Sequence, residues 1–189
     1  MRSVGLPLMS PHRNPPPPEG RTLGEAERDQ ECLDAALRFL SHRQRSEREV
    51  RRRLAEKGHG SDRIDRVVER LRELKLVDDR EFADYWLTER QLHKPRGQRA
   101  LRAELFQKGV PRELVDEALG AGERDEVDDA YRAAEKRAAQ LSRLDEAGFR
   151  QRLSQFLLRR GFDWETVIPV VDRLWHEHVN ERIVPRENV

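Results

Sequence analysis

The apolar residues of this chain recur at helical spacing around three glycines. Gly58, Gly109 and Gly161 stand 51 and 52 residues apart, and alignment on them superimposes VRRRLAEKG (50–58), LRAELFQKG (101–109) and LSQFLLRRG (153–161). Five positions are apolar in all three copies, namely those eight and four residues before the glycine and those six, nine and ten residues after it. Such spacing gives two helices with one apolar face each, joined at a glycine that favours the left-handed conformation.

A further helix is expected before each of these pairs, over residues 24–41, 79–93 and 123–142. The pattern therefore predicts an all-α fold, an elongated and curved array of three tandem three-helix repeats. Each repeat is too small to bury much apolar surface alone, so neighbouring repeats should stack. The expected boundaries are 23–77, 78–121 and 122–179, between a disordered, proline-rich tail (1–22) and a C-terminal tail (180–189).

Several residues indicate where these helices begin. Two pairs fit capping boxes: Ser46 with Glu49, and Asp78 with Glu81. Other expected start signals are N-caps at Ser61 and Asp163, and Pro111 in a first helical turn. Pro169 falls inside the last expected helix and should kink it or delay its start. The aromatic residues expected to fill the cores are Phe39, Phe82, Trp86, Trp164 and Trp175.

Composition supports helices with solvated faces and thin cores. Charged residues make up 39% of the chain and hydrophobic residues only 36%, yet 37 basic and 36 acidic residues leave a formal net charge of +1. The single Cys32 excludes an intramolecular disulfide and a cysteine-based zinc cluster. No apolar run approaches the roughly 18 residues of a membrane span, and no signal peptide is evident. The expected location is the cytoplasm.

The chain carries no recognisable catalytic constellation. It has no phosphate-binding loop, no GxSxG and no HExxH. His176 and His178 are two residues apart on an expected helix and so point in different directions, which makes them a poor pair for one metal ion. Cys32 is expected to be a small core residue. The sequence predicts neither an enzyme nor a cofactor.

Basic residues recur in the first two repeats but not in the third. Arginine stands thirteen, ten and seven residues before both Gly58 and Gly109, and lysine stands immediately before both; the third copy has Gly148, Gln151 and Ser154 at the three arginine positions. Two interpretations stay open: the cations are solvated, helix-favouring residues, or they form a surface for an anionic partner. The candidate binding residues are Arg45, Arg48, Arg51, Lys57, Arg96, Arg99, Arg102 and Lys108. Arg53 is expected to pack its stem beside the core.

Three stretches together resemble the regulatory protein RecX family. They are ALRFLSHRQRSEREVRRRLAEKG, RVVERLRELKLVDDREFADYW and PRGQRALRAELFQKGV, and the resemblance covers roughly residues 32–175. It implies a non-enzymatic modulator of the bacterial recombinase RecA, built from tandem three-helix repeats. Such proteins are thought to lie in the groove of the RecA–single-stranded DNA filament and to inhibit its ATP hydrolysis, strand exchange and co-protease action.

The resemblance implies RecA and its filament as partners of a monomer, with at most weak direct contact to DNA. The alternative is a stand-alone helical nucleic-acid-binding protein, since three-helix units can also read DNA. A net charge of +1 argues against that alternative.

Overall fold

The structure, a computed structural model, describes residues 23–121 and 125–183, and the side chains of 24–121 and 125–178. Within these ranges the chain forms helices and no strand. The helices are α1 (Leu23–Leu40), α2 (Glu47–Glu56), α3 (Ser61–Glu73), α4 (Asp79–His93), α5 (Gln98–Lys108), α6 (Arg112–Gly120), α7 (Glu126–Gln140), α8 (Glu146–Arg159) and α9 (Trp164–Ile183). The expected proline-rich tail lies outside the described residues. Helix α9 continues into the first four residues of the segment expected to be a C-terminal tail.

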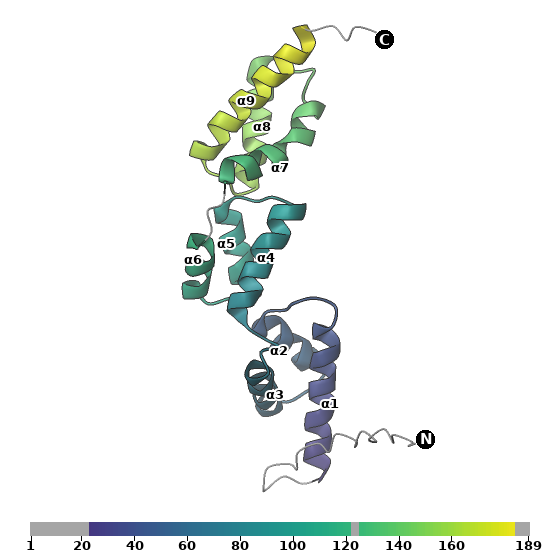
Figure 1. The fold of residues 1–189 in the computed structure, drawn as a ribbon. Coiled ribbons are helices and arrows are strands. Elements are labelled where there is room, and N and C mark those ends of the chain that lie inside the picture. The colour runs from purple at the N-terminus through teal and green to yellow at the C-terminus, as the bar shows by residue number, and fades with distance from the viewer. Residues whose placement is uncertain (1–22, 122–124, 184–189) are drawn as a thin grey trace, which may run out of the picture.

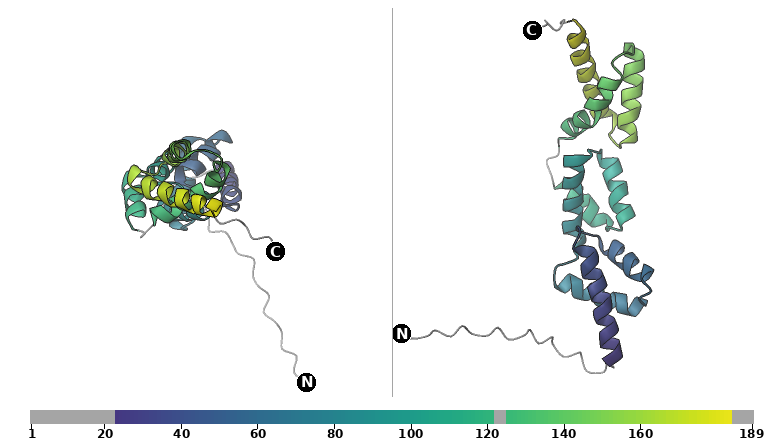
Figure 2. Two further views of the ribbon diagram at one scale, coloured as in Figure 1. Left: turned by 90° about the horizontal axis from the view of Figure 1, so that it is seen from above. Right: turned by 90° about the vertical axis from the view of Figure 1, so that its right-hand side faces the viewer.

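Three units of three helices each are stacked end to end in an elongated array, as expected (Figure 1). We call α1–α3 unit 1, α4–α6 unit 2 and α7–α9 unit 3. In every helix pair with extensive contact, both helices belong to the same unit. In Figure 1 the middle unit is offset to one side of the other two, which gives the array a shallow bow, and the view along the long axis is compact (Figure 2).

Each unit has a hydrophobic core of its own. The five apolar positions of the repeat are buried in every copy, which confirms the periodicity. Cys32 is fully buried in unit 1, as expected, and burial raises the pKa of its thiol. Trp164 is an exception among the aromatic residues. It is 56% exposed as the first residue of α9, so the expectation that it fills a core is wrong.

The glycine turns form as expected. Gly58, Gly109 and Gly161 have φ angles of 84°, 86° and 88°, a conformation that a side chain would strain. Each glycine N–H donates a hydrogen bond to a carbonyl of the preceding helix and so closes its last turn.

Most of the expected helix starts are present, with two shifts of one residue. Ser46 and Glu49 form the complete capping box, and the side chains of Asp78 and Asp163 accept hydrogen bonds from first-turn N–H groups. The expected box of Asp78 with Glu81 is only half formed, because the Glu81 N–H donates to Asp78 but the Glu81 side chain does not return a bond. Ser61 is the first residue of α3 rather than its N-cap, which is Gly60. Pro111 in turn is the N-cap of α6 rather than part of its first turn. Pro169 lies within α9 and does not delay its start at Trp164.

Separate cores predict separate responses to core damage. Leu54→Ala removes a fully buried side chain from unit 1 and should cost about 2–5 kcal/mol of unfolding free energy. Because no buried apolar cluster of residues 24–121 and 125–178 joins two units, amide hydrogen exchange measured by mass spectrometry should accelerate mainly within residues 24–77. Leu105→Ala and Leu157→Ala, at the matching positions, should act mainly in units 2 and 3. Uniform acceleration along the chain would contradict this independence.

Candidate functional site

Units 1 and 2 meet where the N-terminus of α2 abuts the C-terminus of α5. The Ser46 hydroxyl donates a hydrogen bond to the backbone carbonyl of Lys108 at 2.6 Å. The next residue, Glu47, donates its backbone N–H to the carboxylate of Asp79, the first residue of α4, at 2.9 Å. The N-terminus of α2, the second helix of unit 1, thus supplies a donor to the C-terminal carbonyl of α5, the second helix of unit 2. This arrangement also aligns the dipoles of the two helices favourably.

Units 2 and 3 meet through the same two contacts, one repeat further along. Gly97 N–H donates to the carbonyl of Arg160 at 3.1 Å, and Gln98 N–H donates to the carboxylate of Glu126, the first residue of α7, at 2.6 Å. Gly97 aligns with Ser46, and Arg160 aligns with Lys108. The two joints are therefore copies of one polar contact, although the donor is a hydroxyl in one and a backbone N–H in the other.

The glycine turn of the following unit is packed tightly into each joint. A Cβ atom on Gly109 would lie 2.3 Å from Cδ of Arg48, whose stem crosses the turn. A Cβ atom on Gly97 would lie 2.3 Å from backbone atoms of Gly161. Arg99, which aligns with Arg48, donates to the carbonyl of Leu158 at 2.9 Å. The arginine ten residues before the glycine thus contacts the next unit in both cases.

A buried carboxylate strengthens the first joint. Glu49 is 5% exposed and accepts from Lys108 Nζ at 2.7 Å and from Arg43 at 3.0 Å. Burial opposes ionisation of Glu49, but the hydrogen bonds from Lys108 and Arg43 outweigh it, so the pKa lies below the usual value. Asp79 differs, because burial raises its pKa and the hydrogen bond from Glu47 N–H offsets this only in part.

The arginines seven residues before the glycine brace the inside of their own units. Arg51 pairs with Glu47 at 2.7 Å and with Asp65 of α3. Arg102 of α5 makes the matching pair with Asp116 of α6. Asp65 and Asp116 both stand seven residues after the glycine. The repetition of these two arginines therefore has a structural explanation within each unit.

The arginines thirteen residues before the glycine are also engaged. The Arg45 guanidinium lies 4.1 Å from the centre of the Phe39 ring, and burial lowers its pKa. Arg96 pairs with Glu104 at 3.0 Å. The expected contact of Arg53 with the core is a looser one, since its guanidinium lies 5.9 Å from the Phe39 ring and its side chain is 47% exposed.

Three of the eight candidate cations have no hydrogen-bond or ion-pair partner for their side chains within the described residues, namely Arg45, Arg48 and Lys57. Arg45 lies over the Phe39 ring, which leaves Arg48 and Lys57. Both are exposed. They are nine residues apart, two and a half helical turns, and so lie on opposite sides of α2. The structure thus does not gather the eight candidates into one patch, and Arg48 and Lys57 are the members left to meet a partner.

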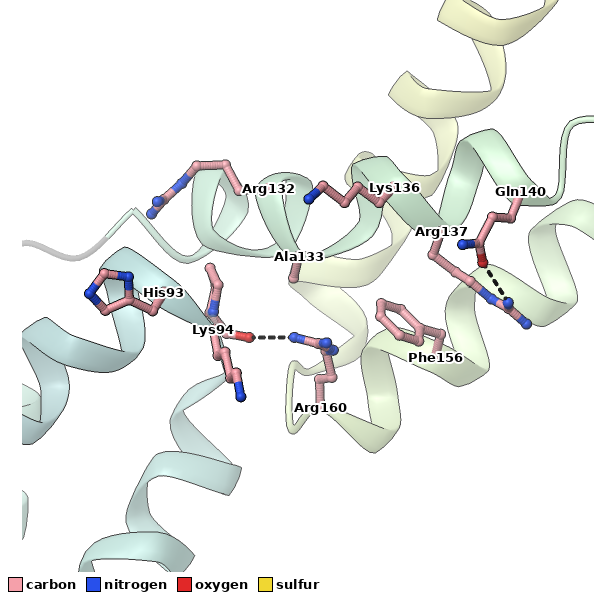
Figure 3. A pocket seen from close by; sticks show the side chains of 10 residues that line it. His93, Lys94, Arg132, Ala133, Lys136, Arg137, Gln140, Phe156 and Arg160 are labelled. Atoms are coloured by element: carbon pink, nitrogen blue, oxygen red, sulfur yellow. Dashed lines mark hydrogen bonds between the residues drawn. The ribbon is translucent and has the colours of Figure 1, made fainter.

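A second cationic feature, which sequence reasoning missed, lies beside the joint of units 2 and 3. A hollow of about 450 Å³ is lined by Lys94 and Pro95 of unit 2 and by residues of α7 and α8 (Figure 3). Its cationic lining residues are Lys94, Arg132, Lys136, Arg137 and Arg160, together with His93, and it has no acidic lining residue. These residues are scattered over 68 positions of sequence, so only the fold shows their proximity.

Two other kinds of site are absent from the part of the chain that the structure describes. No group of three or more histidine, cysteine, aspartate or glutamate side chains is placed to hold a metal ion there. None of the described helices combines the length and the apolar character needed to cross a membrane.

Family models place all three units in one family. The first, second and third three-helix domains of RecX match residues 32–71, 78–119 and 124–171, in that order. The chain belongs to the RecX family. The ranges follow the three structural units and agree with the resemblance noted in the sequence.

Individual relatives support the same assignment. Regulatory protein RecX of Chlorobaculum tepidum is 39% identical over 136 residues, which is 72% of this chain and 83% of the relative. That of Mycobacterium avium is 32% identical over 160 residues, covering 82% and 90% of the two chains. The crystal structure of RecX from Lactobacillus salivarius aligns with a TM-score of 0.69 over 79% of this chain and 97% of its own, at 23% identity, and so shows the shared fold.

The tight packing between units 2 and 3 predicts that Gly97 tolerates no side chain. Gly97→Ala should destabilise the contact between units 2 and 3 by about 1–3 kcal/mol, because the new methyl group would overlap the backbone of Gly161. Gly60→Ala is a matched control, since Gly60 is also a helix N-cap with nearly the same φ and ψ but has open space around it. Hydrogen exchange of residues 96–100 should accelerate only in Gly97→Ala. Equal behaviour of the two variants would contradict the tight joint.

The first joint predicts a defined pH dependence. Since the pKa of Glu49 is lower in the folded chain, its ionised form stabilises the fold above the ordinary glutamate pKa of about 4.3, and this contribution disappears as pH falls through the lowered value. Glu49→Gln should therefore reduce the melting temperature at pH 7 and have a smaller effect at pH 3. Glu56→Gln, on the exposed side of the same helix, should change little at either pH. A constant Glu49→Gln effect would argue against this role.

Proposed function

We propose that this chain binds RecA, or the RecA–single-stranded DNA filament, in the cytoplasm and negatively modulates its ATPase, strand-exchange and co-protease activities without being an enzyme itself. The observation that carries the proposal is the match of all three units to RecX domains. The relatives are named regulatory proteins, which agrees with a modulating rather than a catalytic role.

The architecture suits a filamentous partner. Three small units in a row present successive surfaces, and a first contact raises the effective concentration of the next. The polar joints hold the units in sequence, so a monomer could contact neighbouring subunits of a filament. Weak individual contacts would then add up to useful affinity.

The exposed cations of unit 1 offer two sides of α2 to test. Arg48 and Lys57 are available for an acidic surface of the partner, and they lie on opposite sides of α2. Four other candidates serve the structure through contacts with Asp65, Leu158, Asp116 and Glu49, in that order: Arg51, Arg99, Arg102 and Lys108. Substitution of those four would confuse loss of binding with loss of folding.

The decisive experiment titrates the protein against the DNA-stimulated ATPase of preformed RecA filaments. Half-inhibition should occur well below the concentration that coats the same DNA without RecA. Inhibition that appears only at coating concentrations would instead support the stand-alone nucleic-acid-binding alternative. Arg48→Gln or Lys57→Gln, whichever faces the partner, should raise the half-inhibitory concentration about tenfold, which corresponds to about 1.4 kcal/mol.

Two controls make this titration specific. Arg28→Gln removes an exposed cation from α1 and should leave inhibition unchanged. All variants should retain the helical circular dichroism and melting temperature of the parent chain. If neither Arg48→Gln nor Lys57→Gln weakens inhibition, the cations of α2 are not the contact with RecA.

A further inference from the structure

The hollow beside the second joint carries positive charge that the chain does not neutralise. The side chains of Lys94 and Lys136 have no hydrogen-bond or ion-pair partner in the described part of the chain. Arg137 is bonded only to the neutral amide of Gln140 at 2.9 Å. Of the five lysine and arginine side chains around the hollow, only that of Arg132 pairs with carboxylates, those of Asp128 and Asp129.

A departure from the repeat explains part of this excess. Arg160 aligns with Lys108, and Ala100 aligns with Glu49. In the first joint Glu49 pairs with Lys108, whereas in the second joint the carboxylate is replaced by the methyl group of Ala100, against which Gly161 packs. Arg160 is left with the carbonyl of Pro95 at 3.2 Å as its hydrogen-bond partner, and burial together with the nearby Arg96 lowers its pKa.

The charged side chains that line the hollow are hydrogen-bond donors. Two acceptors of its lining, Pro95 O and Gln140 Oε1, already accept hydrogen bonds from Arg160 and Arg137. Figure 3 shows the cationic side chains of three helices around the same space, with Ala133 and Phe156 between them. A ligand that fits this lining must therefore carry negative charge and hydrogen-bond acceptors, and it should have few hydrogen-bond donors of its own.

We propose that this hollow, between units 2 and 3, is a binding site for the phosphodiester backbone of single-stranded nucleic acid. Phosphodiesters carry charge and acceptor oxygens and have no backbone donors, which complements a lining of lysine and arginine. An acidic peptide would also bring amide N–H donors, which lysine and arginine side chains cannot match with acceptors. A single flexible strand can also enter a hollow between two units more readily than a duplex.

The site has a consequence for the array. Lys94 belongs to unit 2, whereas Lys136 and Arg137 belong to unit 3. A strand bound between them contacts both sides of the joint at once, and so holds the two units in one relative orientation. Binding can be measured on a free strand, so the proposal stands apart from any action on RecA.

The test is fluorescence anisotropy of a labelled oligodeoxythymidine strand with the full chain, over a range of salt concentrations. Lys94→Gln/Lys136→Gln should weaken binding at least tenfold. It should also reduce the slope of log affinity against log salt by about 1.4, because each cation lost from a single-strand site accounts for about 0.7. Arg28→Gln/Arg38→Gln removes the same charge from exposed positions of α1 and should change affinity less than twofold.

Competition and footprinting separate the remaining outcomes. Unlabelled single strand should compete well, whereas duplex of equal length and polyglutamate should compete poorly. Bound strand should also protect Lys94 and Lys136 of the unaltered chain from acetylation, with the exposed Lys75 as reference. Equal loss of affinity in both double variants, effective competition by polyglutamate or duplex, or unprotected Lys94 and Lys136 would each overturn the proposal.

Discussion

The arrangement of this molecule depends on one contact that occurs twice. In each copy, the N-terminus of the middle helix of one unit donates a hydrogen bond to the C-terminal carbonyl of the middle helix of the next unit. Ser46 does so to Lys108 with its side chain, and Gly97 does so to Arg160 with its backbone. Among the described residues no hydrophobic cluster spans two units, so these donors, with the carboxylates of Asp79 and Glu126, hold the array together. Polar joints of this kind are directional, and they fix how the units succeed one another.

The same constraint explains why a chain so rich in arginine is almost neutral. Arg51 and Arg102 pair with aspartates across the two helices that flank the glycine turn, and Lys108 pairs with Glu49 across a joint. Thin cores leave much of each helix in water, and pairs between helices supplement the small apolar area. Many basic residues thus have structural roles, and those with no such partner, Arg48 and Lys57 among them, become informative.

Apolar periodicity and helix-end chemistry were enough to predict the helices, because both depend on neighbours within about ten residues. Leu54, Leu105 and Leu157 are buried and Gly58, Gly109 and Gly161 are left-handed, as the spacing requires. The role of the recurring arginines was not predictable in the same way. Arg48 and Arg99 look alike in sequence, yet the stem of one crosses a glycine and the guanidinium of the other binds a carbonyl, both in the next unit. Contacts between units depend on stacking, which local pattern does not describe.

Divergence at equivalent positions is where such a repeat can acquire new chemistry. The backbone contact of the joint survives when Glu49 is replaced by Ala100, because the joint needs only an N-cap donor and a carbonyl. Loss of the carboxylate leaves Arg160 uncompensated, and α7 adds Lys136 and Arg137 beside it. The third unit shows the converse, since Gln151 stands where Arg48 and Arg99 stand, and no further unit stacks on that end of α8 within the described residues. The charge at these repeat positions therefore depends on whether a joint forms there and on which partner the joint supplies. A cluster of unpaired cations at a joint is not needed for the fold.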